Sequence, residues 1–298
     1  MKNSNKIYFI AFSLILTATF FSIYYAPLFI TKLLSLMMIG AFSEFILVRF
    51  QKKTLRSYGM GSAFAAGLLT CSLPHNMPYW QLLIGIFFAS WMVKPVLPII
   101  GIRLNSALAA RLLLMLLFPN ECTSWGAASI DTLSTATPQE LYRAEGVKLD
   151  LSMLCLGPIQ GNWMDFYTIV PGSPGLNLPL LLIILLIVFT YKNLCNRYTL
   201  IAYVISFSII NILYQADPIY NLITASSLFS MLFLFSDPYS TPKSKLGKII
   251  FGIIIGLSNG LIRHETYYTE AMVYAVLIAN LFTPFLDRFL QLENNHSV

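Results

Sequence analysis

The stretch DTLSTATPQE, at residues 131–140, brings side chains that could do chemistry close together along the chain. It places one carboxylate, Asp131, and four hydroxyls within seven residues: Thr132, Ser134, Thr135 and Thr137. Hydroxyl groups in such a run can hydrogen-bond, cap a helix or form an ester. A Ser or Thr before Pro is also a normal helix start. A plain turn ahead of a helix from Pro138 is therefore one open interpretation of this stretch.

The composition of the whole chain indicates a membrane protein. Of its 298 residues, 57% are hydrophobic and only 11% are charged, whereas soluble domains carry about 25% charged residues. A helix needs about 20 mostly apolar residues to cross a hydrocarbon core of about 30 Å. A scan at that length predicts an all-α polytopic protein with ten transmembrane spans, at roughly 7–25, 29–48, 61–73, 80–97, 104–118, 178–191, 200–214, 219–235, 249–262 and 267–286.

Two of the ten predicted spans are short, and the N-terminal span could be mistaken for a secretory signal. The spans at 61–73 and 104–118 are too short for a full crossing unless the helices are tilted, re-entrant or broken. Lys2 and Lys6 precede the first apolar run, but this run is long for a signal peptide and no small-residue cleavage site follows it. We therefore expect a retained first helix.

The positive charges predict the topology. The net charge is +6, and alternate loops hold 14 of the 19 Lys and Arg residues: Lys2, Lys6, Arg49, Lys52, Lys53, Arg56, Lys94, Arg103, Lys192, Arg197, Lys243, Lys245, Lys248 and Arg288. This bias is typical of cytoplasmic loops. It predicts cytoplasmic termini and an extracytoplasmic segment at 119–175. Because topology accounts for the charge, no nucleic-acid partner is expected.

Two parts of the chain share an order of features. Each contains a helix of small residues, a turn with Pro, a helix with Gly and Ile, and a further helix that ends in Pro; these parts begin at Gly61 and Thr224. The chain then divides into a first five-helix repeat (1–118), a long loop (119–175) and a second repeat (176–298). Five helices per half make the second copy enter the membrane from the opposite face, as in inverted repeats with binding sites near the midplane. A general likeness of apolar helices is the open alternative.

Isolated polar residues give weaker signals. Arg111 and Glu270 lie in predicted spans, where a charge is costly, so each should face the protein interior and a partner. The four Cys and three His residues form no close group, and no metal site is expected. Cys122 and Cys155 share the outer loop, which leaves a disulfide between them open.

The outer loop and its surroundings resemble a known family. D-x-x-S-x-A-T, ending at Thr137, looks like the acceptor sequence of extracytoplasmic flavin transferases, which join FMN through its phosphate to the final Thr. From about Gly59 to Arg288 the chain resembles the RnfD component of the Rnf-type ion-translocating electron-transport complex and the NqrB component of the sodium-translocating NADH:quinone reductase. The motifs that carry this resemblance, in order, are GSAFAAGLLTCSLPHNMPYW, NSALAARLLLMLLFP, VPGSPG, FSDPYSTP and LIRHETYYTEAMVYAVLIANLFTPFLD.

The resemblance implies a function and a set of site residues. The chain would be a multi-pass subunit of a redox-driven ion translocase in the bacterial inner membrane, not catalytic alone. FMN would be esterified to Thr137 in the extracytoplasmic loop, with Ser134 and Thr135 hydrogen-bonding near the phosphate. Asp131 would be a recognition residue for the transferase, because a carboxylate and a phosphate repel each other.

The resemblance also implies partners and an electron route. A partner subunit with its own flavin would pass electrons to this FMN, and their transfer through the helices would be coupled to Na⁺ or H⁺ movement. Other membrane and flavin or iron–sulfur subunits, and the flavin transferase, are the implied partners. A quinone and a second site for riboflavin are left open, without assigned residues.

Three positions depart from the family pattern. Thr135 stands where Gly is usual, Ser106 replaces Pro in the Asn-Pro-Ala of the fifth helix, and Leu176 replaces an acidic residue after VPGSPG. These departures concern the details of quinone or second-flavin binding and leave Thr137 in place. Two other functions stay open: a flavin-free transporter or channel for a small solute, since inverted repeats are a transporter architecture, and an assembly subunit without cofactor.

Overall fold

The computed structural model describes most of the chain: residues 3–24, 26–50, 61–125, 137–146, 148–151, 154–155, 172–175, 178–224, 226–235, 237, 239–266, 268 and 270–295. Within these ranges the secondary structure is helical and contains no strand. This agrees with the all-α fold that the composition predicts.

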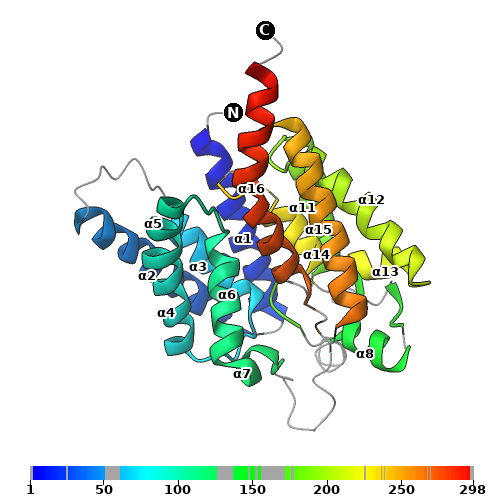
Figure 1. Cartoon of the computed structure of the whole chain (residues 1–298). Helices are drawn as coiled ribbons and strands as arrows, with labels where there is room; N and C mark the ends of the chain where they lie inside the picture. Colours follow the sequence, from blue (N-terminus) through cyan, green and yellow to red (C-terminus); the bar gives the residue numbers. More distant parts are fainter. Residues whose placement is uncertain are drawn as a thin grey trace. The chain divides into compact units, whose positions relative to one another are not determined.

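The helices follow the predicted apolar segments (Figure 1). Up to the outer segment they are α1 (Asn3–Tyr24), α2 (Phe29–Phe50), α3 (Gly61–Ser72), α4 (Tyr79–Phe87), η2 (Phe88–Val93), α5 (Lys94–Val96), η3 (Leu97–Ile100) and α6 (Ser106–Leu117). The segment 119–175 contains α7 (Pro119–Thr123) and α8 (Pro138–Glu145). The remainder forms α11 (Pro179–Tyr191), α12 (Arg197–Leu213), α13 (Pro218–Ile223), α14 (Ser227–Phe233), α15 (Lys245–Glu265) and α16 (Met272–Asn295).

Each of the ten predicted spans contains a helix, although not all of them are long. Four helices in the described part of the chain have the length and composition to cross a membrane: 29–50, 79–100, 245–265 and 272–290. The helices of the third and fifth spans are short, as expected, with 12 residues each. The eighth span is broken, because Thr224 leaves the helical conformation between α13 and α14. The count of ten crossings and the inverted repeat stay predictions.

The fourth span changes helix type along its length. It begins as α4, widens into the π-helix η2, and ends in the 3₁₀-helix η3. Pro95 and Pro98 fall in this second half, and neither has the backbone N–H that an α-helix needs. The missing donors account for the irregular end of the span. Gly101, with φ +80°, then ends it in a left-handed conformation that suits Gly.

The chain divides into two compact units. The first contains residues 1–96 and 106–181, and the second contains 97–105 and 182–298. In the first unit, α2, α3, α4 and α6 surround a core that includes Leu36, Leu69, Leu82 and Leu114. In the second unit, α15 packs against both α12 and α16. The short segment 97–105 thus belongs with residues far along the chain.

Candidate functional site

Thr137 caps the N-terminus of α8. Its Oγ1 accepts a hydrogen bond from the backbone N–H of Glu140 (3.3 Å), and its own backbone N–H donates to Glu140 Oε2 (2.6 Å). This reciprocal pair is a capping box, and Pro138 occupies the first helical position, where its missing N–H costs nothing. The helix start at Pro138, which the sequence left as an open interpretation, is present in the structure. Thr137 is buried, at 5% exposure.

The other residues predicted to lie around a flavin on Thr137 are outside the described part of the chain. Asp131, Ser134 and Thr135 belong to this group. The charges described nearby come from α8 and the residues that follow it. Arg143 lies in the last turn of α8, and Lys148 Nζ lies 5.4 Å from the centre of the Tyr142 ring.

The end of the segment 119–175 is attached to α3. The backbone N–H of Gly175, from the VPGSPG motif, donates to the carbonyl of Cys71 (2.8 Å). Cys122 and Cys155 are free thiols, so the structure does not contain the disulfide that the sequence left open. Burial raises the pKa of the Cys122 thiol to about 11, although the charge of Arg111 acts in the opposite direction. Arg111 itself is buried in α6, as expected.

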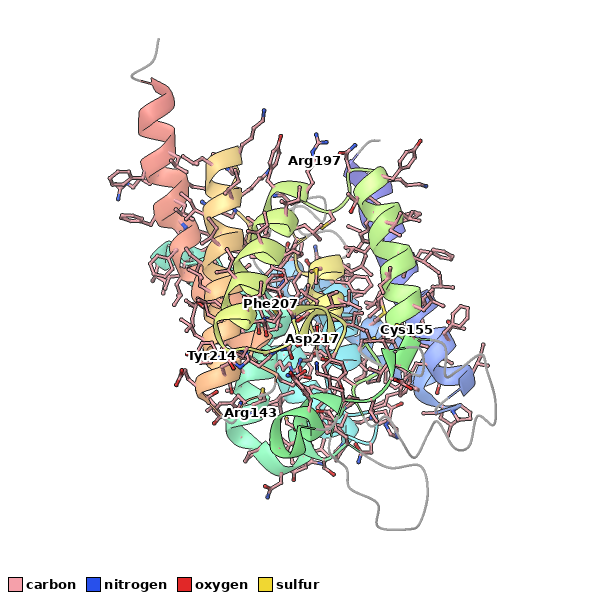
Figure 2. All side chains as sticks on the ribbon, turned by 90° about the vertical axis from the view of Figure 1, so that its right-hand side faces the viewer. Arg143, Cys155, Arg197, Phe207, Tyr214 and Asp217 are labelled. Atoms are coloured by element: carbon pink, nitrogen blue, oxygen red, sulfur yellow. The ribbon has the colours of Figure 1, made fainter. Side chains whose placement is uncertain are left out.

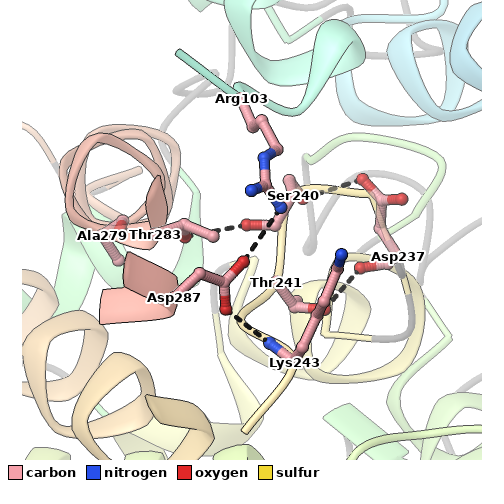
Figure 3. A network of polar contacts seen from close by, with 8 residues as sticks. All are labelled: Arg103, Asp237, Ser240, Thr241, Lys243, Ala279, Thr283 and Asp287. Carbon is pink, nitrogen blue, oxygen red and sulfur yellow. Dashed lines mark hydrogen bonds and ion pairs between the residues drawn. The ribbon is translucent and has the colours of Figure 1, made fainter. Parts of the chain in front are cut away.

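A polar cluster in the second unit joins three motifs that are distant in sequence (Figure 3). Asp237, from FSDPYSTP, accepts hydrogen bonds through Oδ2 from Ser240 Oγ (2.8 Å) and Asn105 Nδ2 (3.1 Å). Its backbone carbonyl accepts from Thr241 Oγ1 (2.8 Å). Asp237 therefore holds its own loop and the segment before α6 together. Ser106, the departure next to Asn105, is the first residue of α6, a position that accepts Pro or Ser.

Asp287 of α16 completes this cluster. Its Oδ2 accepts from Arg103 Nη1 (3.0 Å), and its Oδ1 accepts from the backbone N–H of Lys243 (2.8 Å). One turn earlier on α16, Thr283 Oγ1 donates to the carbonyl of Ser240 (3.0 Å). Asp287 is buried, so both of its oxygens need such partners.

A second polar network surrounds Arg263 in α15. This arginine is 1% exposed, and it donates to the carbonyl of Asn221 (2.7 Å) and to Ser227 Oγ (3.3 Å). Tyr203 OH contacts the same Ser227 oxygen (3.1 Å) and accepts from Asn259 Nδ2 (2.9 Å). The helices α13 and α14, on either side of the break, thus provide a carbonyl and a hydroxyl that accept hydrogen bonds from the buried Arg263 guanidinium.

An ion pair joins α2 to the irregular fourth span in the first unit. Lys94 Nζ lies 3.6 Å from Glu44 Oε2 and donates to Ser62 Oγ (2.8 Å). Glu44 Oε2 also accepts from the backbone N–H of Ser62 (2.7 Å), in the first turn of α3. A Cβ on Gly61 would lie 2.7 Å from Lys94 Nζ, so a larger residue at that position would make the lysine side chain shift.

The sequence did not predict which residues pair with these buried charged side chains. Glu44 is a carboxylate within a predicted span, and Asp287 and Arg263 lie one residue beyond the ends of predicted spans. A charge in or beside an apolar span signals a buried partner, but local sequence does not identify that partner. No group of three or more His, Cys, Asp or Glu side chains in the described ranges could hold a metal ion.

Comparison with known proteins gives the family. A family model described as NQR2, RnfD, RnfE matches residues 2–295. The chain is 29% identical over 252 residues to the RnfD component of the Na⁺-translocating ferredoxin:NAD⁺ oxidoreductase complex of Acetobacterium woodii, an alignment that covers 83% of this chain and 76% of the relative. It is 27% identical to the corresponding component of the proton-translocating ferredoxin:NAD⁺ oxidoreductase complex of Clostridium ljungdahlii, with 78% and 73% of the two chains covered.

A relative from the other type of complex is similar to a comparable degree. The NqrB component of the Na⁺-translocating NADH-quinone reductase of Klebsiella pneumoniae is 27% identical over 283 residues, which cover 89% of this chain and 66% of the relative. The resemblance of the motifs to both types of component is therefore confirmed. Because the family model matches almost the whole chain, this multi-pass membrane protein belongs to the NQR2, RnfD, RnfE family.

Proposed function

We propose that the chain is a membrane subunit of an ion-translocating oxidoreductase complex that carries electrons through FMN esterified to Thr137. The observation that carries this proposal is the place of Thr137 at the end of D-x-x-S-x-A-T, in a chain whose relatives are subunits of such complexes. Electron transfer would be coupled to movement of Na⁺ or H⁺. One relative is named as Na⁺-translocating and another as proton-translocating, so experiment must decide between the two ions for this chain.

The geometry of Thr137 suits a phosphoester. Its Oγ1 accepts one hydrogen bond, from the Glu140 N–H, and an ester oxygen keeps a lone pair that can still accept it. The dipole of α8 favours a phosphate at its N-terminus, although Pro138 has no N–H and the Glu140 N–H is already used in the cap. Glu140 opposes this with a negative charge, and its carboxylate is already bound to the backbone N–H of Thr137. The Thr137 hydroxyl and the helix dipole are therefore the local features that fit the group.

FMN, when bound, supplies one- and two-electron redox chemistry, and the protein supplies position and surroundings. Thr137 would fix the flavin phosphate at the start of α8, and a covalent link keeps the cofactor at high effective concentration. Thr137 is nearly covered, so its hydroxyl must become accessible before a transferase can modify it. Loading should therefore be faster before the outer segment is fully folded.

The test separates the hydroxyl from its capping role. The chain is produced with a flavin transferase, and the denatured protein is inspected for flavin fluorescence in a gel. Thr137→Ser should keep the fluorescent band, and Thr137→Asn should lose it. Asn remains a good N-cap but has no hydroxyl to esterify, whereas an Ala variant would also lose about 1 kcal/mol of capping.

A matched control lies in the same outer segment. Thr123 Oγ1 donates a hydrogen bond to the carbonyl of Pro119 (2.9 Å). Thr123→Ala should leave the fluorescence unchanged. Fluorescence that persists in Thr137→Asn would place the flavin elsewhere. A wild-type band without fluorescence, in the presence of active transferase, would contradict the electron-carrier function and favour a flavin-free transporter or assembly subunit.

A further inference from the structure

A groove runs along the outer surface of α12 and α15. It has a volume of about 420 Å³, and apolar side chains line it. Three residues of α12 form one wall (Ile201, Ile205 and Ile209), and three of α15 form the other (Ile249, Ile253 and Leu257). The described contacts leave these walls open, with Ile201, Ile205 and Ile209 all more than half exposed.

Small residues form the base of the groove, where α12 and α15 pack closely against each other. Glycines of α15 face α12: a Cβ on Gly252 would lie 2.5 Å from the carbonyl oxygen of Thr199, and one on Gly256 would lie 1.9 Å from Ser206 Oγ. Small residues of α12, Ala202 and Ser206, line the groove between its walls. The hydroxyl of Ser206 donates to the carbonyl of Ala202 (2.8 Å), so it presents no unsatisfied donor to the groove.

Both walls begin with a basic residue. Arg197 precedes Ile201, Ile205 and Ile209 at steps of four residues, and Lys245 precedes Ile249, Ile253 and Leu257 in the same way. Residues four apart lie on the same helix face. Thr199 pairs with Gly252 and Ile210 with Gly260, so the helices run parallel and both charges lie at one end.

The position of Arg197 supports a role at a membrane surface. Its guanidinium lies 5.7 Å from the centre of the Tyr198 ring, which also lines the groove. Aromatic residues such as Tyr concentrate at the level of lipid headgroups. Figure 2 shows Arg197 at one end of α12 and Tyr214 at the other. From Tyr198 to Ile209 the groove is roughly 16 Å long at 1.5 Å per residue, close to the half-thickness of about 15 Å of the hydrocarbon core.

We propose that this groove binds an anionic phospholipid of one leaflet. An acyl chain would lie between the two apolar walls, and the headgroup phosphate would lie between Arg197 and Lys245. The charges decide the occupant. A transmembrane helix of a partner would fill an apolar groove without needing two cations at one end, and a zwitterionic lipid would gain little from them.

The first experiment removes the charges. The purified protein is titrated with phosphatidylglycerol and with phosphatidylcholine, and bound lipid is counted by native mass spectrometry. The wild type should prefer phosphatidylglycerol. A lysine or arginine near an anionic lipid surface contributes about a fivefold affinity change, so Arg197→Ala and Lys245→Ala should each lower the affinity for phosphatidylglycerol by about that factor. The matched control, Arg49→Ala with Lys192→Ala, removes two exposed basic residues that neither line the groove nor precede its walls on α12 and α15, and it should have no effect.

The second experiment fills the groove. Ile205→Trp should displace the lipid, whereas Ile187→Trp, at an exposed position of α11, should not. Equal retention of both lipids by the wild type, or unchanged binding in Ile205→Trp and in the two charge variants, would overturn the proposal. So would loss of lipid in the intact complex accompanied by crosslinks from Ile205→Cys to another subunit, because the occupant would then be a partner helix.

Discussion

His75 lies in the turn between α3 and α4, where a buried lysine fixes the backbone. Lys32 Nζ donates to the carbonyl of His75 (2.8 Å) and to that of Met77. The imidazole ring lies 6.0 Å from the ring of Phe21. Burial and the charge of Lys32 lower the pKa of His75 below its ordinary value of 6.5. The neutral imidazole is therefore the form that suits the folded protein.

This shift predicts a loss of stability in acid. Well above pH 6.5 His75 is neutral in both the folded and the unfolded state, but as the pH falls through 6.5 the unfolded state binds the proton more readily. The thermal midpoint of the wild type should therefore fall between pH 7.5 and 5.5 by more than that of His75→Asn. The Asn variant keeps the backbone carbonyl that Lys32 needs. An equal fall in both proteins would show that His75 does not contribute.

Thr137 shows how far sequence reasoning reaches for a single residue. A helix start after the Thr137 hydroxyl was one open interpretation of the sequence, and the capping box shows that the helix does start there. Glu140, which completes the box, was not singled out, although the spacing of a capping box is a sequence signal. The roles of Asp131, Ser134 and Thr135 stay predictions, because these residues lie outside the described ranges.

At the scale of elements, the contact between α12 and α15 depends on glycine. A methyl group on Gly256 would lie 1.9 Å from Ser206 Oγ and 2.9 Å from the backbone nitrogen of Phe207. The first atom can move with its side chain, but the second belongs to the helix backbone. The two helices must therefore separate to admit any larger side chain.

Gly256→Ala should destabilise the protein by about 1–3 kcal/mol, the usual cost of overpacking. In an open helix the same change would stabilise by about 1 kcal/mol, so the sign of the effect is diagnostic. Thermal unfolding in detergent measures it, with the partly exposed Ser258→Ala of the same helix as control. A rise in the midpoint of Gly256→Ala would contradict the close packing.

The elements themselves were largely predictable. A run of apolar residues is a local signal, so all ten predicted ranges contain helix. Helix type was not predictable in the same way. The π-helix at Phe88–Val93 and the break between α13 and α14 depend on how the backbone is satisfied by its surroundings, which hydropathy does not report.

At the scale of the whole chain, segments distant in sequence meet in one polar cluster. Arg103 and Asp287 are separated by 184 residues. Asp287 is the last residue of one motif that carries the family resemblance, and Arg103 lies two residues before another. Sequence reasoning identified the motifs but not their meeting, because no local periodicity reports contacts between segments so far apart.

A double-mutant cycle tests this long-range contact. Arg103→Ala and Asp287→Ala should show a coupling free energy of about 0.5–3 kcal/mol, the range found for residues in one network. Asp287→Ala should cost more than Arg103→Ala, because it also leaves the backbone N–H of Lys243 without its partner. Unfolding midpoints of the four proteins give the coupling. Strictly additive effects would show that the pair does not join the two segments.

The central claim concerns one covalent bond, and mass spectrometry tests it most directly. The protein is isolated from its native membranes without denaturing steps that break phosphoesters, and then digested. The peptide that contains Thr137 should carry the mass of FMN less one water, with fragment ions that locate the addition on this residue. The same peptide recovered wholly unmodified, from membranes in which the complex is active, would contradict the account.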